Sequence, residues 1–198
     1  MARPRIGVMG GAFDPFHRGH LAAATQAADL LHLDRVIFAP TGQAWHKDAI
    51  VADADVRLLM TVAGTADDPR FEVSRVDLDR AGPTYTVDTL TDLRQQRAEA
   101  GLPEADWFFI TGADAAAGFL SWRDPQQILE QAHLVVVTRP GHDLAVPGVP
   151  PERVILLEIP GIDLSSTQVR ERVARGESID DLVPAAVAEI IRAHGLYA

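Results

Sequence analysis

Two histidines near the start of the chain have the spacing of residues that act together. His17 and His20 are three positions apart, and Gly19 lies between them. Residues three apart on a helix share one side of it, so both imidazoles would point to the same place. Imidazole donates hydrogen bonds, moves protons and binds metals near neutral pH. The pair predicts a reactive site, with ordinary helix capping or core packing as the alternative.

The stretch that contains this pair also favours phosphate binding. Residues 10–20 read Gly-Gly-Ala-Phe-Asp-Pro-Phe-His-Arg-Gly-His, after an apolar strand-like run and before a helix-like one. Paired glycines permit a sharp turn and a close approach of the backbone to a ligand. The helix start offers N–H groups and a partial positive charge to an anion. The pattern is neither a dinucleotide fingerprint nor a Walker A loop. A metal site is the lesser option, because no third ligand is evident.

A second group of polar residues follows near the C-terminus. Ser165, Ser166 and Thr167 precede Arg170 on a segment with helical character. Hydroxyls at a helix start usually cap it. Here the guanidinium three residues after the threonine lies near the same helix end, where N–H groups and hydroxyls also favour an anion. Capping and phosphate binding are compatible, so the sequence predicts a second anion-binding corner.

The elements that would position these groups alternate along the chain. Alternating strands and helices imply right-handed crossovers and a parallel sheet covered on both faces. We expect an α/β fold: a single Rossmann-like, doubly wound domain over 1–198, mainly parallel, with a C-terminal helical part (about 163–198) packed on it. Ligands bind at the carboxyl edge of such a sheet, where the histidine stretch lies. The predicted strands are 5–9, 35–39, 71–78, 107–110, 134–138 and 154–159; the predicted helices are 20–33, 56–63, 86–100, 125–131, 166–175 and 184–194.

Composition excludes several other classes of protein. The chain has 198 residues, a formal charge of −10 and no cysteine, which rules out disulfides and cysteine-ligated metals. An acidic balance disfavours sequence-independent binding of nucleic acid. No apolar run approaches the ~20 residues of a membrane span, and the first one is too short for a signal peptide. We expect a soluble cytoplasmic protein without nucleic-acid or membrane partners. A homo-oligomer stays open.

The histidine stretch resembles a known family. Its H-x-G-H is shared by a nucleotidyltransferase superfamily, and the fuller G-G-x-F-D-P-x-H-x-G-H resembles bacterial nicotinate-nucleotide adenylyltransferases. Further segments carry the same resemblance, which spans residues 6–197. They are Thr-Tyr-Thr-Val-Asp-Thr-Leu (84–90), Gly-Ala-Asp (112–114), Arg-Pro-Gly (139–141) and Ser-Ser-Thr-Gln-Val-Arg (165–170).

The resemblance implies adenylyl transfer from ATP to nicotinate mononucleotide. The 5′-phosphate of the mononucleotide attacks the α-phosphorus in line, giving nicotinate adenine dinucleotide and pyrophosphate. His17 and His20 would serve the α-phosphate and bridging region, while Arg170 would steady the β- and γ-phosphates. Mg²⁺ would arrive bound to ATP, with few direct protein ligands. The other residues that the resemblance places at ATP are Gly10, Gly11, Phe13, Gly112, Asp114, Ser166 and Thr167.

The same resemblance implies a site for the mononucleotide. His46 and Lys47 follow the second strand, and Lys47 would meet the phosphate; Ala44-Trp45 replaces the two prolines common in the family. The backbone near Thr86 would meet the nicotinate carboxylate, and Trp122 would stack on the pyridine ring. Without the family, Thr86 reads as a helix start and Trp122 as a core residue.

Three rival functions stay open at this point. A sister adenylyltransferase would use nicotinamide mononucleotide or phosphopantetheine. A sensor on the same fold would bind nucleotide without turnover, because fold alone does not decide function. A fragment of a tRNA-charging enzyme would share H-x-G-H, but the acidic balance and the absence of a Lys-Met-Ser-Lys-Ser run oppose it.

Overall fold

A single parallel sheet forms the centre of the molecule. The computed structural model describes residues 3–43, 50–138, 146, 148–159 and 164–198. In these residues each strand pairs with its neighbours in parallel. The spatial order is β3 (Phe71–Val73), β2 (Arg35–Pro40), β1 (Arg5–Gly11), β4 (Asp106–Gly112), β5 (His133–Thr138) and β6 (Val154–Glu158). This is the doubly wound order, so the predicted Rossmann-like α/β class is confirmed.

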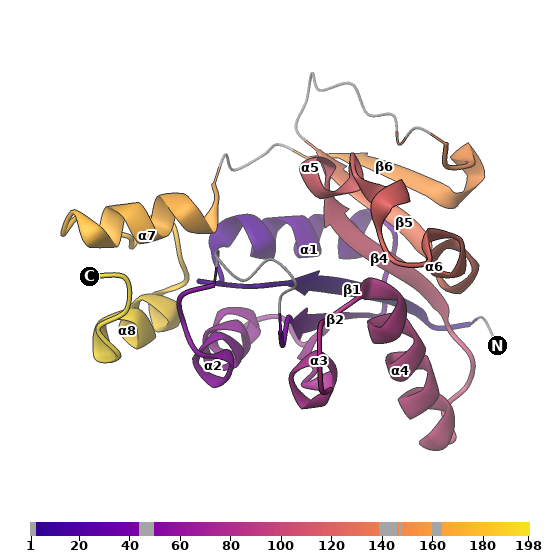
Figure 1. The fold of residues 1–198 in the computed structure, drawn as a ribbon, viewed down its shortest axis with the longest axis horizontal. Coiled ribbons are helices and arrows are strands. Elements are labelled where there is room, and N and C mark those ends of the chain that lie inside the picture. Colours follow the sequence, from indigo (N-terminus) through magenta and orange to yellow (C-terminus); the bar gives the residue numbers. More distant parts are fainter. Residues whose placement is uncertain (1–2, 44–49, 139–145, 147, 160–163) are drawn as a thin grey trace.

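Helices connect the strands and cover the sheet (Figure 1). The crossovers carry α1 (Arg18–Leu30), α2 (Ala54–Thr65), α3 (Val76–Asp79), α4 (Thr86–Glu99), α5 (Ala113–Ala116) and α6 (Pro125–Gln131). Two 3₁₀ turns, Phe119–Ser121 and Pro151–Arg153, flank α6 and β6. After the last strand come α7 (Ser166–Ala174) and α8 (Ala185–Ala193).

Side-chain alternation along β4 separates the two faces of the sheet. Phe108 and Ile110 belong to the core under α1, whereas Trp107 and Phe109 belong to the core under α4 and α6. Successive residues of a strand point to opposite faces, so a strand that is apolar throughout must be covered on both. The buried runs of β4 and β5 are of this kind.

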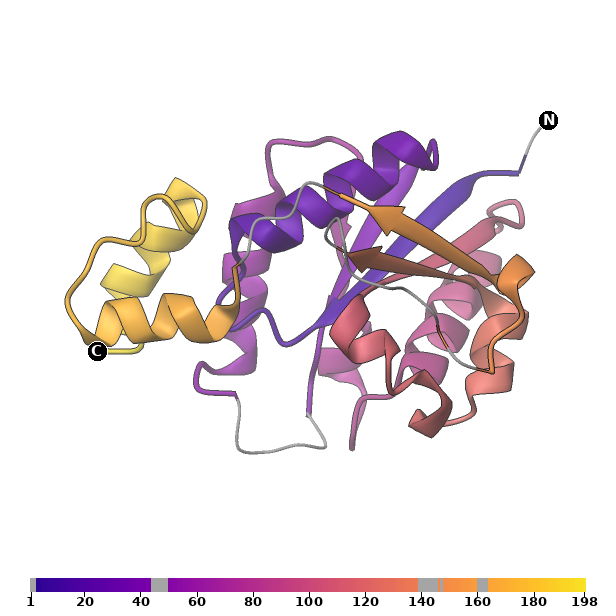
Figure 2. The ribbon, with the colours of Figure 1, turned by 90° about the horizontal axis from the view of Figure 1, so that it is seen from above.

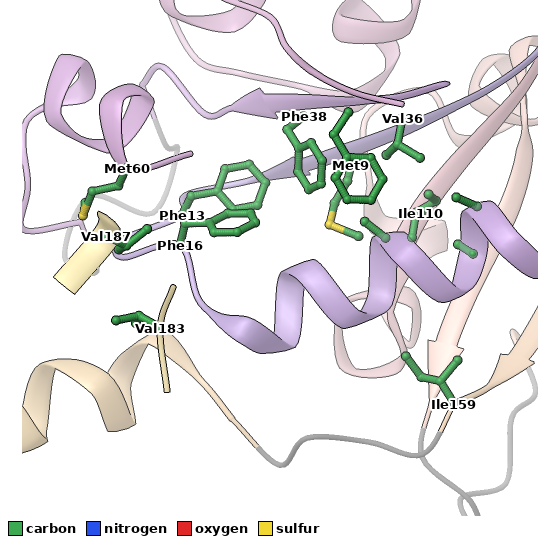
Figure 3. Packing of buried hydrophobic residues seen from close by; sticks show 14 of the residues in the cluster. Met9, Phe13, Phe16, Val36, Phe38, Met60, Ile110, Ile159, Val183 and Val187 are labelled. Carbon is green, nitrogen blue, oxygen red and sulfur yellow. The ribbon is translucent and has the colours of Figure 1, made fainter. Parts of the chain in front are cut away.

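The last two helices lie beyond the carboxyl ends of the strands (Figure 2). Val183 and Val187 are fully buried in the same core cluster as Phe13 and Phe16, which lie between the first strand and α1 (Figure 3). Helix α8 packs on α2 as well. This shared core supports our proposal that residues 163–198 form one domain with the rest.

The structure corrects one predicted element and adds others. The segment 71–78 alternates like one strand, but only Phe71–Val73 is extended, and Val76–Asp79 is a helical turn. The turn buries Asp77, whose carboxylate accepts from the Thr89 hydroxyl at 2.7 Å. A partner twelve residues away therefore overrides the local pattern. The short helix α5 was not predicted either.

Candidate active site

A cavity of about 490 Å³ opens at the carboxyl edge of the sheet, over the ends of β1, β4 and β5. The chain leaves β1 toward β2 on one side and enters β4 on the other, so this is the point where strand order reverses and ligands bind in such folds. Polar groups converge on it from α1, β4, α5, β5 and α7. Its lining includes Gly10, His17, Gly19, His20, Thr111, Gly112, Asp114, Thr138, Ser165 and Ser166.

The two histidines lie side by side on one wall of this cavity. Their rings stack with centroids 3.6 Å apart and planes 20° from parallel. His17 is the N-cap of α1 and His20 is its third residue, whose ring accepts from the backbone N–H of the N-cap as in one half of a capping box. The capping alternative is thus correct, and it is compatible with chemistry because both rings also line the cavity.

The hydrogen bond between them fixes the tautomer of His20. The backbone N–H of His17 donates to Nδ1 of His20 at 3.2 Å. A neutral imidazole whose Nδ1 accepts must carry its proton on Nε2. Burial lowers the pKa of His17 to about 4 and lowers the pKa of His20 well below its usual value. Both rings are therefore neutral near pH 7, and His20 offers an N–H donor from Nε2.

An aromatic layer supports the histidine pair. Phe13 packs edge-on against the His20 ring with centroids 5.0 Å apart, and against Phe16 at 5.7 Å. Its backbone is in the left-handed region, with φ 50°, which bulky residues rarely adopt. Its side chain is buried and does not line the cavity. Such strain at a functional turn persists only where the surrounding packing enforces it.

The start of α7 forms the second polar wall. Ser165 caps the helix by accepting from the Gln168 N–H, and Gln168 accepts from the Ser165 N–H in return. The Ser166 hydroxyl donates to the Pro15 carbonyl at 3.0 Å. Arg170 donates to the carbonyl of Asp14 at 2.8 Å and to the Thr167 hydroxyl at 3.2 Å. Residues 165–170, which we call the α7 corner, therefore bind residues 12–17, the turn that ends at His17 and that we call the histidine turn.

Not every predicted ATP residue lines the cavity. Gly10, Gly112, Asp114 and Ser166 do, together with the histidines. Gly11, Thr167 and Arg170 lie beside the turn rather than on the cavity wall. Ser165, part of the predicted anion-binding corner, also lines the cavity. Thr111 and Thr138 were missed; they lie at the carboxyl ends of β4 and β5, which is the signal that would have found them.

Thr86 and Trp122 lie outside this cavity but near each other. Thr86 is the first residue of α4, after Tyr85 at the N-cap. Trp122 is half-buried against Phe109 and Phe119. Arg123 joins the two regions, because its guanidinium lies 4.7 Å from the Tyr85 ring centroid and 3.7 Å from Asp88 on the first turn of α4. A cation thus lies beside the N-terminus of α4.

The predicted residues His46 and Lys47, and the segment 139–141, lie outside the described residues. The described backbone on both sides of the first segment is well anchored. Gly42 donates to the Thr84 hydroxyl at 3.1 Å, and Thr84 donates to the Gln43 carbonyl at 2.9 Å. On the other side, Val51 donates to the Asp14 carboxylate at 2.6 Å. Thr84 lies two residues before Thr86, and Asp14 lies three residues before His17, so the hydrogen bonds on both sides connect to segments that carry predicted site residues.

A buried arginine on α2, Arg57, binds the histidine turn. The sequence analysis did not identify it as a site residue. Arg57 is 1% exposed, and it donates to the carbonyls of Ala12 and Thr41, each at 2.7 Å, and of Ala52 at 3.2 Å. Burial lowers its pKa, while Asp14, Tyr197 and Asp53 oppose that effect. A guanidinium fixed by three carbonyls keeps separate loops in register.

Two findings concern metals and membranes. Among the described residues, no group of three or more His, Cys, Asp or Glu is arranged to hold a metal ion. No helix in the described part of the chain has the length and hydropathy needed to cross a bilayer.

Comparison with known sequences gives a consistent result. A family model described as cytidylyltransferase-like matches residues 8–172. The chain is 56% identical to a probable nicotinate-nucleotide adenylyltransferase of Leifsonia xyli subsp. xyli, over 99% of this chain and 95% of the relative. It is 51% identical to a protein of the same name from Streptomyces coelicolor, over 96% of this chain and 98% of that one.

Solved structures show the same fold at lower identity. The nicotinic acid mononucleotide adenylyltransferase of Plasmodium falciparum, complexed with NaAD, has a TM-score of 0.77 at 16% identity. The alignment covers 98% of this chain and 97% of that one. A putative nicotinate-nucleotide adenylyltransferase of Vibrio parahaemolyticus gives 0.69 at 20% identity, over 98% and 95%.

Proposed function

This chain belongs to the nicotinate-nucleotide adenylyltransferase family, and we propose that it joins the adenylyl group of ATP to nicotinate mononucleotide and releases pyrophosphate. One observation carries the proposal for the site: the stacked His17–His20 pair and the α7 N-terminus face one cavity at the strand-order reversal. The 5′-phosphate of the mononucleotide attacks the α-phosphorus of ATP in line. Two anions must meet, so the barrier is largely electrostatic and positional.

The histidines act as hydrogen-bond donors on the α-phosphate and bridging oxygens. His20 is the better-defined donor, because its Nδ1 already accepts from the His17 backbone and its Nε2–H is left for the cavity. Negative charge grows on the bridging oxygen as the bond to pyrophosphate breaks, so this bond strengthens in the transition state. A bound polyphosphate would also raise the lowered pKa values of both histidines, because a nearby anion favours the charged imidazole.

The α7 corner steadies the departing pyrophosphate. Ser166 lines the cavity at the helix start, where N–H groups and the helix dipole favour an anion. Arg170 and Thr167 stand on the same turn of α7 and add a cation and a hydroxyl. Asp114 accepts hydrogen bonds from the ribose of ATP. Gly10 and Gly112 let ATP approach the backbone, whereas Gly11 leaves room for the Phe13 ring. Phe13 acts through its backbone and its packing against His20.

Mg²⁺ would enter with ATP. The phosphate oxygens would supply most of its ligands, and Asp114 is a carboxylate on the described cavity wall that could contribute to holding it. When bound, it neutralises charge that builds on the phosphates. The cytoplasmic location stays a prediction of the sequence, and a homo-oligomer stays open.

The mononucleotide lies toward Thr86 and Trp122. The α4 N-terminus supplies N–H groups for the nicotinate carboxylate, and the Trp122 face supports the pyridine ring. His46 and Lys47 are assigned to the same substrate from the sequence alone, with Lys47 at its phosphate.

Pyrophosphate release tests the proposal directly. Purified protein, ATP and Mg²⁺ are assayed with nicotinate mononucleotide, nicotinamide mononucleotide and phosphopantetheine. We expect strong preference for the nicotinate substrate. Turnover with another acceptor would keep the chemistry and overturn the substrate. Binding of ATP without turnover of any acceptor would favour the sensor.

A further inference from the structure

The end of the chain contacts the histidine turn at its one buried carboxylate. The Tyr197 hydroxyl donates to Oδ1 of Asp14 at 2.6 Å, across 183 residues of sequence. Asp14 is 1% exposed. The same carboxylate accepts from the backbone N–H groups of Val51 at 2.6 Å and Ala52 at 3.1 Å. One side chain thus joins the C-terminus, the histidine turn and the segment that leads into α2.

A helix-ending motif delivers Tyr197 to this position. Helix α8 ends at Ala193, and Gly195 follows in the left-handed region with φ 57°. Gly195 donates to the Arg192 carbonyl and Leu196 donates to the Ile191 carbonyl, which is the hydrogen-bond pattern of a Schellman motif. Leu196 packs on the core beneath. The chain therefore reverses sharply, so that the tyrosine is placed by the fold rather than by a free tail.

The hydroxyl is a permanent donor. Burial, and then the hydrogen bond to Asp14, raise the pKa of Tyr197 above its ordinary value. The phenol therefore keeps its proton at neutral pH. Arg170 and Arg57 have a smaller, opposite effect and lower the pKa of the Tyr197 hydroxyl, so two cations lie near the Tyr197–Asp14 hydrogen bond.

The C-terminal residues hold the histidine turn at further points. Arg170 donates to the Asp14 carbonyl at 2.8 Å, and Ser166 donates to the Pro15 carbonyl at 3.0 Å. Arg18 donates its backbone N–H to the Leu182 carbonyl at 2.9 Å. His17 lies between these fixed positions. Its placement therefore depends on contacts made by residues more than 140 positions later in the chain.

We propose that Tyr197 is a positioning residue that acts through Asp14 to hold the turn bearing His17 and the segment at Val51 and Ala52. The expected effect of Tyr197 on turnover rests on the proposed function. The Tyr197 ring packs on the core, whereas its hydroxyl contacts only Asp14 among the hydrogen bonds of the described residues. Removing the hydroxyl alone therefore separates positioning from packing.

Tyr197→Phe in the full chain is the first test. We expect kcat to fall about tenfold, because small displacements of reacting groups cost up to roughly 10²-fold, with little change in KM for ATP and a small change in Tm. Amide hydrogen exchange at Val51 and Ala52 should accelerate, while exchange in β4 should not. His194→Ala, an exposed residue on the same turn, is the matched control and should match wild type in both readouts.

A double variant tests whether Tyr197 acts through Asp14. In an Asp14→Asn background, Tyr197→Phe should lower kcat little further, whereas a general structural role would multiply the two losses. Wild-type kcat and exchange in Tyr197→Phe, or fully multiplicative losses, would overturn the proposal. If the wild type itself does not turn over nicotinate mononucleotide, the proposed function fails, and the exchange rates alone decide the Tyr197–Asp14 role.

Discussion

The backbone N–H of His17 donates to Nδ1 of His20, and the two rings stack 3.6 Å apart. One contact therefore ties the N-cap of α1 to its first turn, fixes the tautomer of His20 and orients its ring against that of His17. A backbone donor does not rotate away as a side chain can, so the orientation costs little to maintain. Pre-organised donors of this kind are what phosphoryl and adenylyl transfer require, since the protein need not reorganise as charge develops.

Removing either imidazole should abolish most turnover. We expect His20→Ala and His17→Ala each to lower kcat by at least roughly 10²-fold, the usual cost of one lost transition-state donor. The variants should stay folded, because the core beneath them is formed by Phe13 and Phe16. Steady-state kinetics of pyrophosphate release and circular dichroism check both points. Near-wild-type turnover in either variant would remove the assignment.

Stability should depend on the protonation of His17. Its pKa is lowered from 6.5 to about 4 by burial, so between these values the unfolded chain binds the extra proton and the native state does not. The stabilisation is complete above pH 6.5 and is lost as the pH falls toward 4. For His17 alone the loss reaches about 3 kcal/mol.

Urea unfolding at several pH values measures this effect. Asparagine is a good N-cap, so His17→Asn keeps the helix start and removes the titration. The free energy of unfolding should fall less steeply from pH 6.5 to 4.5 in His17→Asn than in wild type. His194→Ala, which removes an exposed histidine, should follow the wild-type curve. Parallel curves for His17→Asn and wild type would show that burial does not shift this group.

Much of the fold follows from local patterns in the sequence. Short branched runs such as 134–138 are apolar throughout because parallel strands are covered on both faces, and this pattern predicted the sheet. The helix 125–131 was predicted to the residue, because Pro125 marks its first position. Capping residues and turn glycines act on their near neighbours, so their signal is readable without the fold.

The rest depends on partners far apart in the sequence. Asp77 turns an apparent strand into a helix through Thr89 and Arg80, and Tyr197 meets Asp14 across the whole chain. In the sequence, Arg57 resembles a surface cation on an amphipathic helix. In the fold it is buried and donates to carbonyls of two other loops. A sequence pattern identifies a residue type that can do chemistry, whereas only the fold shows which partners it has.

Gly19→Ala should separate stability from activity. An added Cβ would lie 3.0 Å from Nδ1 and Cε1 of the His17 ring and 3.5 Å from the Leu164 carbonyl. The imidazole must then shift by a few tenths of an ångström, so kcat should fall. Alanine is the better helix former by about 1 kcal/mol, so the free energy of unfolding should stay equal or rise.

Kinetics and thermal unfolding of the same samples check Gly19→Ala. Gly118→Ala is the control, because its added Cβ meets the nearest atom at an ordinary 3.6 Å and lies away from the cavity. It should leave kcat unchanged. A Gly19→Ala variant with wild-type kcat would mean that the His17 ring tolerates displacement, and its position would then matter less than the donor itself.

Arg57→Met should be strongly destabilising. Methionine fills the volume but leaves the carbonyls of Ala12, Thr41 and Ala52 without their donors. Each buried acceptor that loses its partner costs about 1–3 kcal/mol, so we expect a loss of at least about 3 kcal/mol in the free energy of unfolding. The free energy of unfolding of Arg57→Lys should lie between those of wild type and Arg57→Met, because an ammonium keeps the charge but cannot donate to several carbonyls as the forked guanidinium does.

Urea unfolding of the Arg57 variants is compared with that of Arg175→Met. Arg175 pairs with Glu177 on the surface, and such exposed pairs contribute little, so this control should unfold like wild type. The order wild type, Arg57→Lys, Arg57→Met in decreasing stability would locate the effect in the forked contacts. Equal stability of Arg57→Met and wild type would show that water or a shifted loop satisfies the three carbonyls. In that case Arg57 would not hold the histidine turn, and kcat in Arg57→Met should then also stay at the wild-type value.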